Sequence, residues 1–162
     1  MNSEGRTAWV FGDNIDTDQL APGGTLKSGI EVVASQCMGR LNPKFATDVR
    51  PGDFVIGGRN FGIGSSREQA AHALCHLGVA AVIAQSFGGI FYRNAFNHGL
   101  MALVCPDASA ITQGERLEVD PEKGTVKNLT RDETYICEAV PSHLVDIVRA
   151  GGLVPYLEAN RR

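Results

Sequence analysis

The chain has 162 residues, with 15 Lys plus Arg against 18 Asp plus Glu, and 43% of its residues are hydrophobic. A chain of this length can bury one sizeable core. Its mildly acidic balance, without a basic stripe, argues against nucleic-acid binding, and no apolar run approaches membrane-spanning length. Residues 1–6 also lack the apolar core of a secretory signal, so we expect a cytoplasmic protein. We also expect a single domain, residues 1–162.

The amino-terminal third predicts one strand, two loops and a helix. Ala8 to Phe11 has the pattern of a first strand, and Asn14 to Pro22 that of a polar loop. Gly23 to Gly29 is rich in glycine, so we expect a mobile segment that becomes ordered when something binds to it. Glu31 to Met38 predicts a short helix.

The middle of the chain alternates strands with helices. Strands are expected at Asp53–Gly57, Val79–Ala84 and Ala102–Cys105, and helices at Ser66–Leu77 and near Tyr92–Asn97. A glycine follows each helix, as is common where a helix ends. This rhythm is typical of an α/β domain.

The carboxyl-terminal third has a different pattern. Short β segments are expected at Arg116–Val119, Thr125–Asn128 and Thr134–Glu138. We expect Ser142 to cap a final helix that ends at Gly151-Gly152. The order of elements therefore predicts an α/β fold, in which layers of sheet and helix share one core.

The segment Asn60–Glu68 has the most specific pattern in the chain. Gly62 and Gly64 flank a single residue, which allows a positive φ or the close approach of another group. Ser65 and Glu68 match the S-x-x-E capping box, which predicts a helix that starts at Ser65 or the next residue. The pattern contains neither a Walker phosphate loop nor a nucleophile elbow.

Arg67 adds a permanent cation to this predicted helix start. A helix amino terminus offers unpaired N–H groups and a positive dipole end, and a guanidinium offers a planar, two-pronged donor. We therefore predict a pocket for a substrate with two or three carboxylates. The alternative is a helix start that binds nothing, because S-x-x-E opens many such helices.

Three ordered motifs resemble one known family. They are Gly12 to Asp18, Asn60 to Ala70, and Ala84-Gln85-Ser86-Phe87 followed by Ile90 to Asn94. Together they resemble the small subunits of 3-isopropylmalate dehydratase (isopropylmalate isomerase) and the swivelling carboxyl-terminal domain of aconitase and homoaconitase. The resemblance runs from Trp9 to Leu153 and implies a three-layer β/β/α swivelling domain.

The resemblance also implies a reaction and a role for each motif residue. Family members move a hydroxyl between neighbouring carbons of a hydroxy acid by removing and re-adding water. By this resemblance, Ser65 is the catalytic base, whereas Ser66 and Arg67 bind a substrate carboxylate. Asp18 and Thr17 belong to the Asp-x-Asp loop beside the site, where we expect Asp18 to orient the serine or the arginine.

No metal site is expected on this chain. Its four cysteines are widely spaced, without a C-x-x-C pair, and have the pattern of small buried hydrophobic residues. His72 and His76 lie four residues apart but have no evident third ligand. In the family, a [4Fe-4S] cluster lies on a separate large subunit. The resemblance therefore implies a heterodimer or heterotetramer in which the partner holds the cluster.

The choice of substrate stays open at this stage. In the family, the loop after the Asp-x-Asp motif distinguishes substrates, and Leu26 and Lys27 lie in the matching region. An apolar Leu26 favours isopropylmalate, whereas a cationic Lys27 favours the extra carboxylate of homocitrate, and dimethylmalate is a third possibility. The segment Ser86–Gly89 departs from the family's Ser-Phe-Ala-Arg. A carboxylate-binding module without catalytic activity is the alternative to an enzyme.

Overall fold

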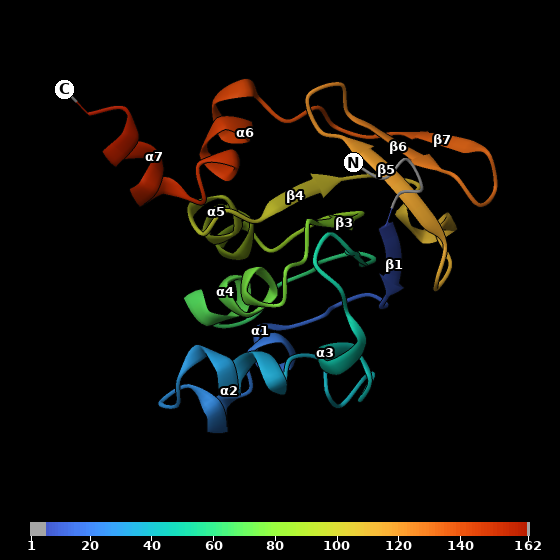
Figure 1. Ribbon diagram of the computed structural model, residues 1–162. Helices are drawn as coiled ribbons and strands as arrows, with labels where there is room; N and C mark the ends of the chain where they lie inside the picture. The colour runs from blue at the N-terminus through green and yellow to red at the C-terminus, as the bar shows by residue number, and fades with distance from the viewer. Residues whose placement is uncertain (1–5, 162) are drawn as a thin grey trace.

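A single mixed sheet organises the chain, as the computed structural model of residues 6–161 shows (Figure 1). The sheet has seven strands in the order β4-β3-β2-β1-β5-β6-β7. Their bounds are β1 Arg6–Val10, β2 Phe54–Ile56, β3 Ala81–Ala84, β4 Met101–Val104, β5 Arg116–Asp120, β6 Thr125–Asn128 and β7 Glu133–Ile136. Strands β1 to β4 are parallel, whereas β5, β6 and β7 are antiparallel to their neighbours. Strand β1 therefore joins a parallel half to an antiparallel half.

Helices cover the parallel half of the sheet. The helices are α1 Thr17–Leu20, α2 Ile30–Ser35, α3 Phe45–Asp48, α4 Glu68–His76, α5 Gly89–Asn97, α6 Ser142–Arg149 and α7 Leu153–Ala159, with 3-10 helices η1 Gly23–Thr25 and η2 Ala108–Ala110. Helix α4 is central, since it packs against α1, α2 and α5. Helix α7 extends from the body beside α6, at the carboxyl-terminal end of the chain in Figure 1.

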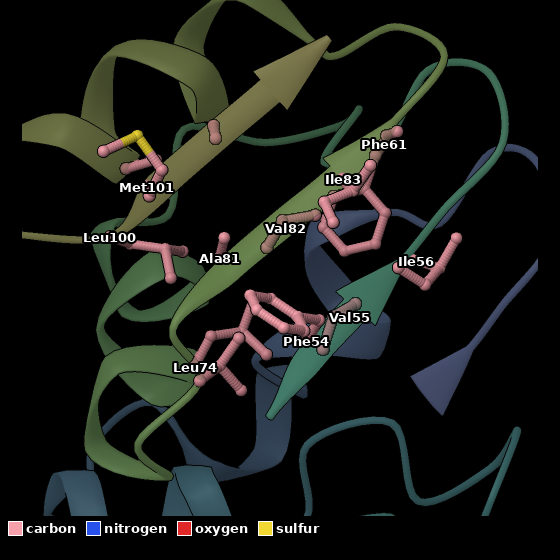
Figure 2. Close-up of a cluster of buried hydrophobic side chains, with 14 of the residues drawn as sticks. Phe54, Val55, Ile56, Phe61, Leu74, Ala81, Val82, Ile83, Leu100 and Met101 are labelled. Atoms are coloured by element: carbon pink, nitrogen blue, oxygen red, sulfur yellow. The ribbon is translucent and has the colours of Figure 1, made fainter. Parts of the chain in front are cut away.

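The core lies on the parallel strands (Figure 2). Every residue of β2 and β3 is buried. Strands that are buried on both faces are continuous apolar runs, which explains the sequences FVI and AVIA. In Figure 2, Phe54, Leu74 and Leu100 bring β2, α4 and the start of β4 into one cluster. The parallel half therefore forms a rigid base for the loops at its strand ends.

The strands and the α/β pattern predicted from the sequence are confirmed, with shifts of a few residues. The expected polar loop Asn14–Pro22 is partly wrong, because it contains α1. Asp16 caps that helix: its carboxylate accepts from the backbone N–H of Gln19, whose side chain accepts from the backbone N–H of Asp16. This D-x-x-Q capping box was visible in the sequence. In the glycine-rich segment, Gly23–Thr25 is a 3-10 helix, and its expected mobility stays a prediction.

The carboxyl-terminal prediction was wrong in two respects. Pro141, not Ser142, is the amino-terminal cap of α6, and no side chain caps that helix. The chain also continues past Gly151-Gly152 into α7, which contains no buried residue. Both glycines have positive φ and form a sharp turn between α6 and α7. They therefore do not mark the end of the final helix. In the middle, α5 begins at Gly89 instead of near Tyr92.

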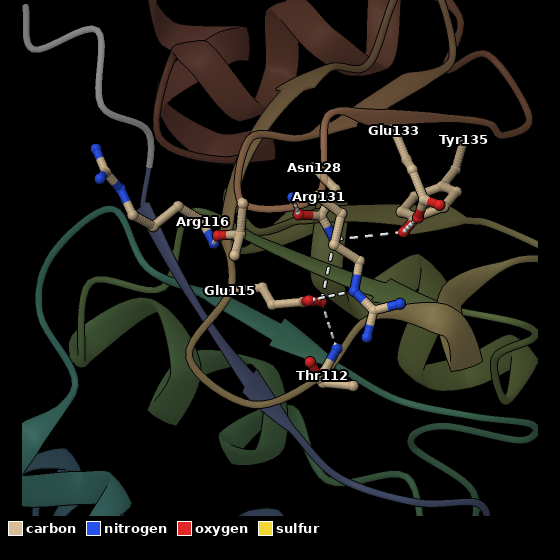
Figure 3. A network of polar contacts seen from close by, with 8 residues as sticks. Thr112, Glu115, Arg116, Asn128, Arg131, Glu133 and Tyr135 are labelled. Carbon is tan, nitrogen blue, oxygen red and sulfur yellow. Dashed lines mark hydrogen bonds and ion pairs between the residues drawn. The ribbon is translucent and has the colours of Figure 1, made fainter.

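A buried carboxylate holds the antiparallel half together (Figure 3). Glu115 is 6% exposed and accepts hydrogen bonds from the backbone N–H of Thr112 and from the side chains of Asn128 and Arg131. Burial alone would raise the pKa of Glu115, but these hydrogen bonds outweigh it and lower the pKa to about 2. The carboxylate therefore links the loop before β5 to the end of β6 and the turn that follows it.

We expect Glu115→Gln to destabilise the fold by about 1–3 kcal/mol at neutral pH, because a neutral amide replaces a buried charged acceptor. The folded pKa of Glu115 lies below its ordinary value of 4.5. Its stabilising contribution is therefore complete above pH 4.5 and is lost as the pH falls towards 2. Denaturant unfolding from pH 7 to pH 2 measures both effects. Glu118→Gln, at an exposed position of the same strand, is the control, and equal unfolding curves for the two variants would contradict the prediction.

Candidate active site

The residues predicted to form the site come together where parallel strands end. The loops after β1, β2 and β3 lie side by side, joined by isolated bridges between Asp16 and Ile63 and between Phe61 and Phe87. In open α/β sheets, ligands bind outside the carboxyl ends of the strands. The order of the sheet therefore places segments from three distant parts of the sequence around one surface.

The two glycines adopt the backbone conformation that was expected of them. Gly62 has φ of 84° and Gly64 has φ of 111°. A Cβ atom on Gly62 would lie 2.2 Å from the ring of Phe91, and one on Gly64 would lie 3.0 Å from Oγ1 of Thr17. Both positions thus require glycine for conformation and for space. The turn is held tightly between α5 on one side and the start of α1 on the other.

The capping box predicted at Ser65 and Glu68 is wrong. Helix α4 begins at Glu68, Arg67 is its amino-terminal cap, and no side chain caps it. Arg67 has an extended backbone, with φ of −107° and ψ of 109°, so the helix cannot extend back to Ser65. The two serines therefore belong to the loop, and neither hydroxyl is used to close the helix.

This correction leaves both serines available to a ligand. Ser65 and Ser66 are exposed, and within residues 6–161 their hydroxyls make no hydrogen bond. The backbone N–H groups of Ser65, Ser66 and Glu68 likewise have no acceptor in this part of the chain. Hydroxyls and N–H groups without protein partners, at the start of a nine-residue helix, form a surface of donors suited to an anion.

Arg67 is held in place by the loop after β1. Its Nη1 donates to Oδ1 of Asp18 at 2.9 Å and to the carbonyl of Ala21 at 2.9 Å. Asp18 also accepts from the backbone N–H of Gly23 at 3.0 Å. The hydrogen bond from Arg67, followed by the one from Gly23, lowers the pKa of the Asp18 carboxyl. Asp18 therefore contacts the arginine that it is expected to orient, and this role stays a prediction.

One edge of the guanidinium remains unused. Only Nη1 has hydrogen-bond partners among the described residues, so Nε and Nη2 are left with their donors free. The Arg67 side chain is 22% exposed. A guanidinium binds a carboxylate through two parallel N–H groups, and the Nε and Nη2 edge supplies such a pair. The fixed side chain would therefore lose little conformational entropy when a carboxylate binds.

The remaining predicted residues lie less directly at this surface. Thr17 is 3% exposed, and its backbone N–H donates to the carbonyl of Ile63, so it supports the loop that carries the serines. Leu26 is partly buried and packs against the core. Lys27 is exposed and makes no ion pair or hydrogen bond within residues 6–161. The carbonyl of Ala21 and the N–H of Gly23 were not foreseen, because backbone contacts of this kind leave no residue-type signal in a sequence.

No metal-binding set is present in the described part of the chain, where no group of three or more His, Cys, Asp or Glu residues could hold an ion. The four cysteines are free; Cys75 is partly exposed and the others are buried. A cavity of about 680 Å³ lies at the amino ends of the strands, where Arg6, Gly52 and Phe54 line it together with residues of β5. It is therefore remote from Ser65 and Arg67. Among residues 6–161, no helix is long and apolar enough to cross a membrane.

Comparison with known proteins agrees with the observed fold. Residues 41–108 match the family model described as the aconitase C-terminal domain. A crystal structure of 3-isopropylmalate dehydratase from Methanocaldococcus jannaschii superposes with a TM-score of 0.89 at 40% identity, covering 96% of this chain and 93% of that one. The fold and the exposed serine-arginine loop thus define an aconitase-type swivelling domain, and the predicted α/β swivelling-domain fold is confirmed.

Sequence relatives show which family within this class the chain belongs to. The 3-isopropylmalate dehydratase small subunit of Wolinella succinogenes is 44% identical over 160 residues, 98% of this chain and 96% of that protein. The methanogen homoaconitase small subunit of Methanothermobacter thermautotrophicus is 45% identical over 150 residues, 91% of this chain and 86% of that protein. The chain belongs to the family of 3-isopropylmalate dehydratase small subunits.

Proposed function

We propose that this chain is the small subunit of a hydro-lyase that interconverts 2-isopropylmalate and 3-isopropylmalate in leucine biosynthesis. The observation that carries the proposal is the fixed Arg67 side chain, whose Nε and Nη2 have no partner within residues 6–161 and which directly follows two exposed serines whose hydroxyls are likewise unbonded there. Family membership at 44% identity over 98% of the chain supports it. The single sheet and shared core of the described residues support a single domain, residues 1–162.

In this proposal the chain binds a carboxylate and moves a proton. Arg67 and Ser66 hold a substrate carboxylate, so that the neighbouring C–H lies against Ser65. Ser65 Oγ removes that proton, and the adjacent carbon loses its hydroxyl. A neutral serine is a weak base, so its alkoxide needs stabilisation from Arg67 and from the free N–H groups of Ser66 and Glu68. The same groups return the proton when water adds in the opposite sense.

The proposed enzyme requires a second chain. The described cysteines do not form a set that could ligate a cluster. We place a [4Fe-4S] cluster on a large partner subunit, where it would supply a Lewis acid for the departing hydroxyl. The exposure of Ser65 and Ser66 supports this arrangement, because an open surface needs another wall to exclude water. A heterodimer or heterotetramer in the cytoplasm would complete the site.

The test is reconstitution with a cognate large subunit under anaerobic conditions, followed by turnover of a substrate panel. We expect isopropylmalate to be the preferred substrate over homocitrate and dimethylmalate. The small apolar surface of Leu26 suits an isopropyl group, although Lys27 could serve an additional carboxylate. Preference for homocitrate would support the alternative of a homoaconitase subunit. Failure of all three acids, in a complex that forms, would support a non-catalytic carboxylate-binding module.

Lys27→Ala decides what the glycine-rich loop recognises. If isopropylmalate is the substrate, the variant should change kcat/KM for isopropylmalate by less than about threefold, because an exposed lysine contributes little to an apolar contact. If homocitrate is the substrate, its kcat/KM should fall by roughly tenfold or more, since a charge contact to a carboxylate is lost. Lys44→Ala, at another exposed lysine outside this loop, is the control.

A further inference from the structure

Cys105 and Cys137 lie opposite one another on two neighbouring extended segments. Strand β4 is the outer strand of the parallel half, and the carbonyl of Val104 at its end faces away from β3. That carbonyl accepts a hydrogen bond of 2.9 Å from the backbone N–H of Glu138. In Figure 1 the chain returns from β7 towards α6 in the direction opposite to β4. In antiparallel strands, one step forward along one strand matches one step back along the other. The bond between residues 104 and 138 therefore places residue 105 directly opposite residue 137.

The position of this pair meets the geometric requirement for a disulfide. Directly opposed antiparallel residues beside a hydrogen-bonded pair have Cα atoms about 4.5 Å apart and side chains on the same face. Disulfides span Cα separations of roughly 4.4–6.8 Å. Each of the two thiols shifts the pKa of the other, as expected for side chains that lie close together. Cys105 is fully buried and Cys137 is 8% exposed, so the pair lies just beneath the surface.

We propose that Cys105 and Cys137 form a redox-sensitive pair that closes to an intramolecular disulfide when the protein meets a hydroperoxide. The Cys105 sulfur attacks the peroxide oxygen, the O–O bond breaks, and Cys105 becomes a sulfenic acid. The Cys137 sulfur then displaces hydroxide from that sulfenic acid. In total, two thiols lose two electrons and two protons, and one peroxide is reduced to water and its hydroxyl product. A dithiol reductant reverses the step.

The local chemistry favours this order of attack. Interaction with the Cys137 thiol lowers the pKa of Cys105 in spite of burial, and the backbone N–H of Asp107 contributes in the same direction. The same interaction and burial raise the pKa of Cys137. We assign Cys105 as the attacking thiol and Cys137 as the resolving thiol. Access needs only a local opening at the end of β7.

The disulfide would connect the two halves of the sheet. It closes a loop of roughly 30 residues that contains β5, β6 and β7, and it fixes the end of this loop to β4. A cross-link of this length should raise Tm by roughly 5–15 °C. The inference does not depend on the proposed reaction, because none of these residues lies at the loop that carries Ser65 and Arg67.

Peroxide titration of the full-length reduced chain tests the proposal. After alkylation of the remaining thiols in denaturant, we expect two of the four cysteines to resist alkylation, and peptide mapping to show Cys105 joined to Cys137. Dithiothreitol should restore all four thiols. The Tm of the oxidised chain should rise in parallel with the fraction of cross-linked peptide.

Cys75 provides a matched control, since it is more exposed than the pair and its thiol donates to the carbonyl of His98. Burial raises its pKa to about 11, so exposure alone does not make it reactive. Cys75→Ser should leave the cross-link and the Tm rise intact, whereas Cys105→Ser should abolish both. If Cys105→Ser does not fold, Cys137→Ser serves instead, and mapping of the unsubstituted chain decides independently. Oxidation confined to Cys75, or cross-links between chains only, would overturn the proposal.

Discussion

Ser65→Ala is expected to lower kcat of the reconstituted enzyme by roughly 10²–10⁴-fold, the range typical of a lost general base. The reason is local, because Ser65 is an exposed hydroxyl without a protein hydrogen-bond partner in the described residues, next to N–H groups that could stabilise an alkoxide. Removing Oγ leaves the backbone and Arg67 in place. KM should therefore change little, and complex formation with the large subunit should not change.

The measurement is single-turnover kinetics together with a binding assay for the large subunit. Ser109→Ala, an exposed serine in η2, is the matched control and should keep full activity. Activity of Ser65→Ala within a few-fold of the unsubstituted enzyme would remove Ser65 from the mechanism. A loss of complex formation would instead assign Ser65 to the subunit interface.

Arg67→Lys is expected to raise KM by roughly 10–100-fold, because an ammonium cannot supply two parallel donors to one carboxylate. The lysine can still form an ion pair with Asp18, but it cannot at the same time donate to Ala21 and offer a fixed two-pronged edge. The guanidinium does both, with Nη1 occupied by the protein and with Nε and Nη2 free. Substrate affinity should therefore suffer more than stability.

Isothermal titration with the substrate or a non-reactive dicarboxylate analogue measures this loss. Arg59→Lys is the matched control, since Arg59 lies in the adjoining loop and its side chain is 74% exposed and forms a surface ion pair with Asp13. Unchanged affinity in Arg67→Lys would reject the carboxylate-binding role. Equal losses in both variants would indicate a general effect of surface charge instead of a specific clamp.

The motif Asn60–Glu68 shows how far local reasoning extends. The positive φ of Gly62 and Gly64 could be predicted from residue type, because glycine adopts this conformation without steric cost. The capping box predicted at Ser65 is not formed, although the residue types match the pattern. The extended backbone of Arg67, whose side chain is bonded to Asp18 and Ala21, sets the start of the helix one turn later. A distant contact thus overrode a local preference.

Other differences have the same origin. Helix α7 carries no buried residue and follows two glycines, so neither periodicity nor capping marked it. It exists through packing on α5 and α6. The pairing of Asp18 with Arg67 across the sequence likewise depends on β1 and β2 being neighbours, which no spacing rule reveals.

The sequence alone determined the alternation of strands and helices, the glycine turn and the identity of the serine-arginine motif, because these depend on residue type and on contacts between near neighbours. Only the tertiary structure decided that β1 lies beside both β2 and β5, that Asp18 fixes Arg67, that both serines stay free of the helix, and that Cys105 faces Cys137. The physical reason is that each of these features joins segments far apart in the chain. Such contacts form only when burial of the shared core brings the segments together.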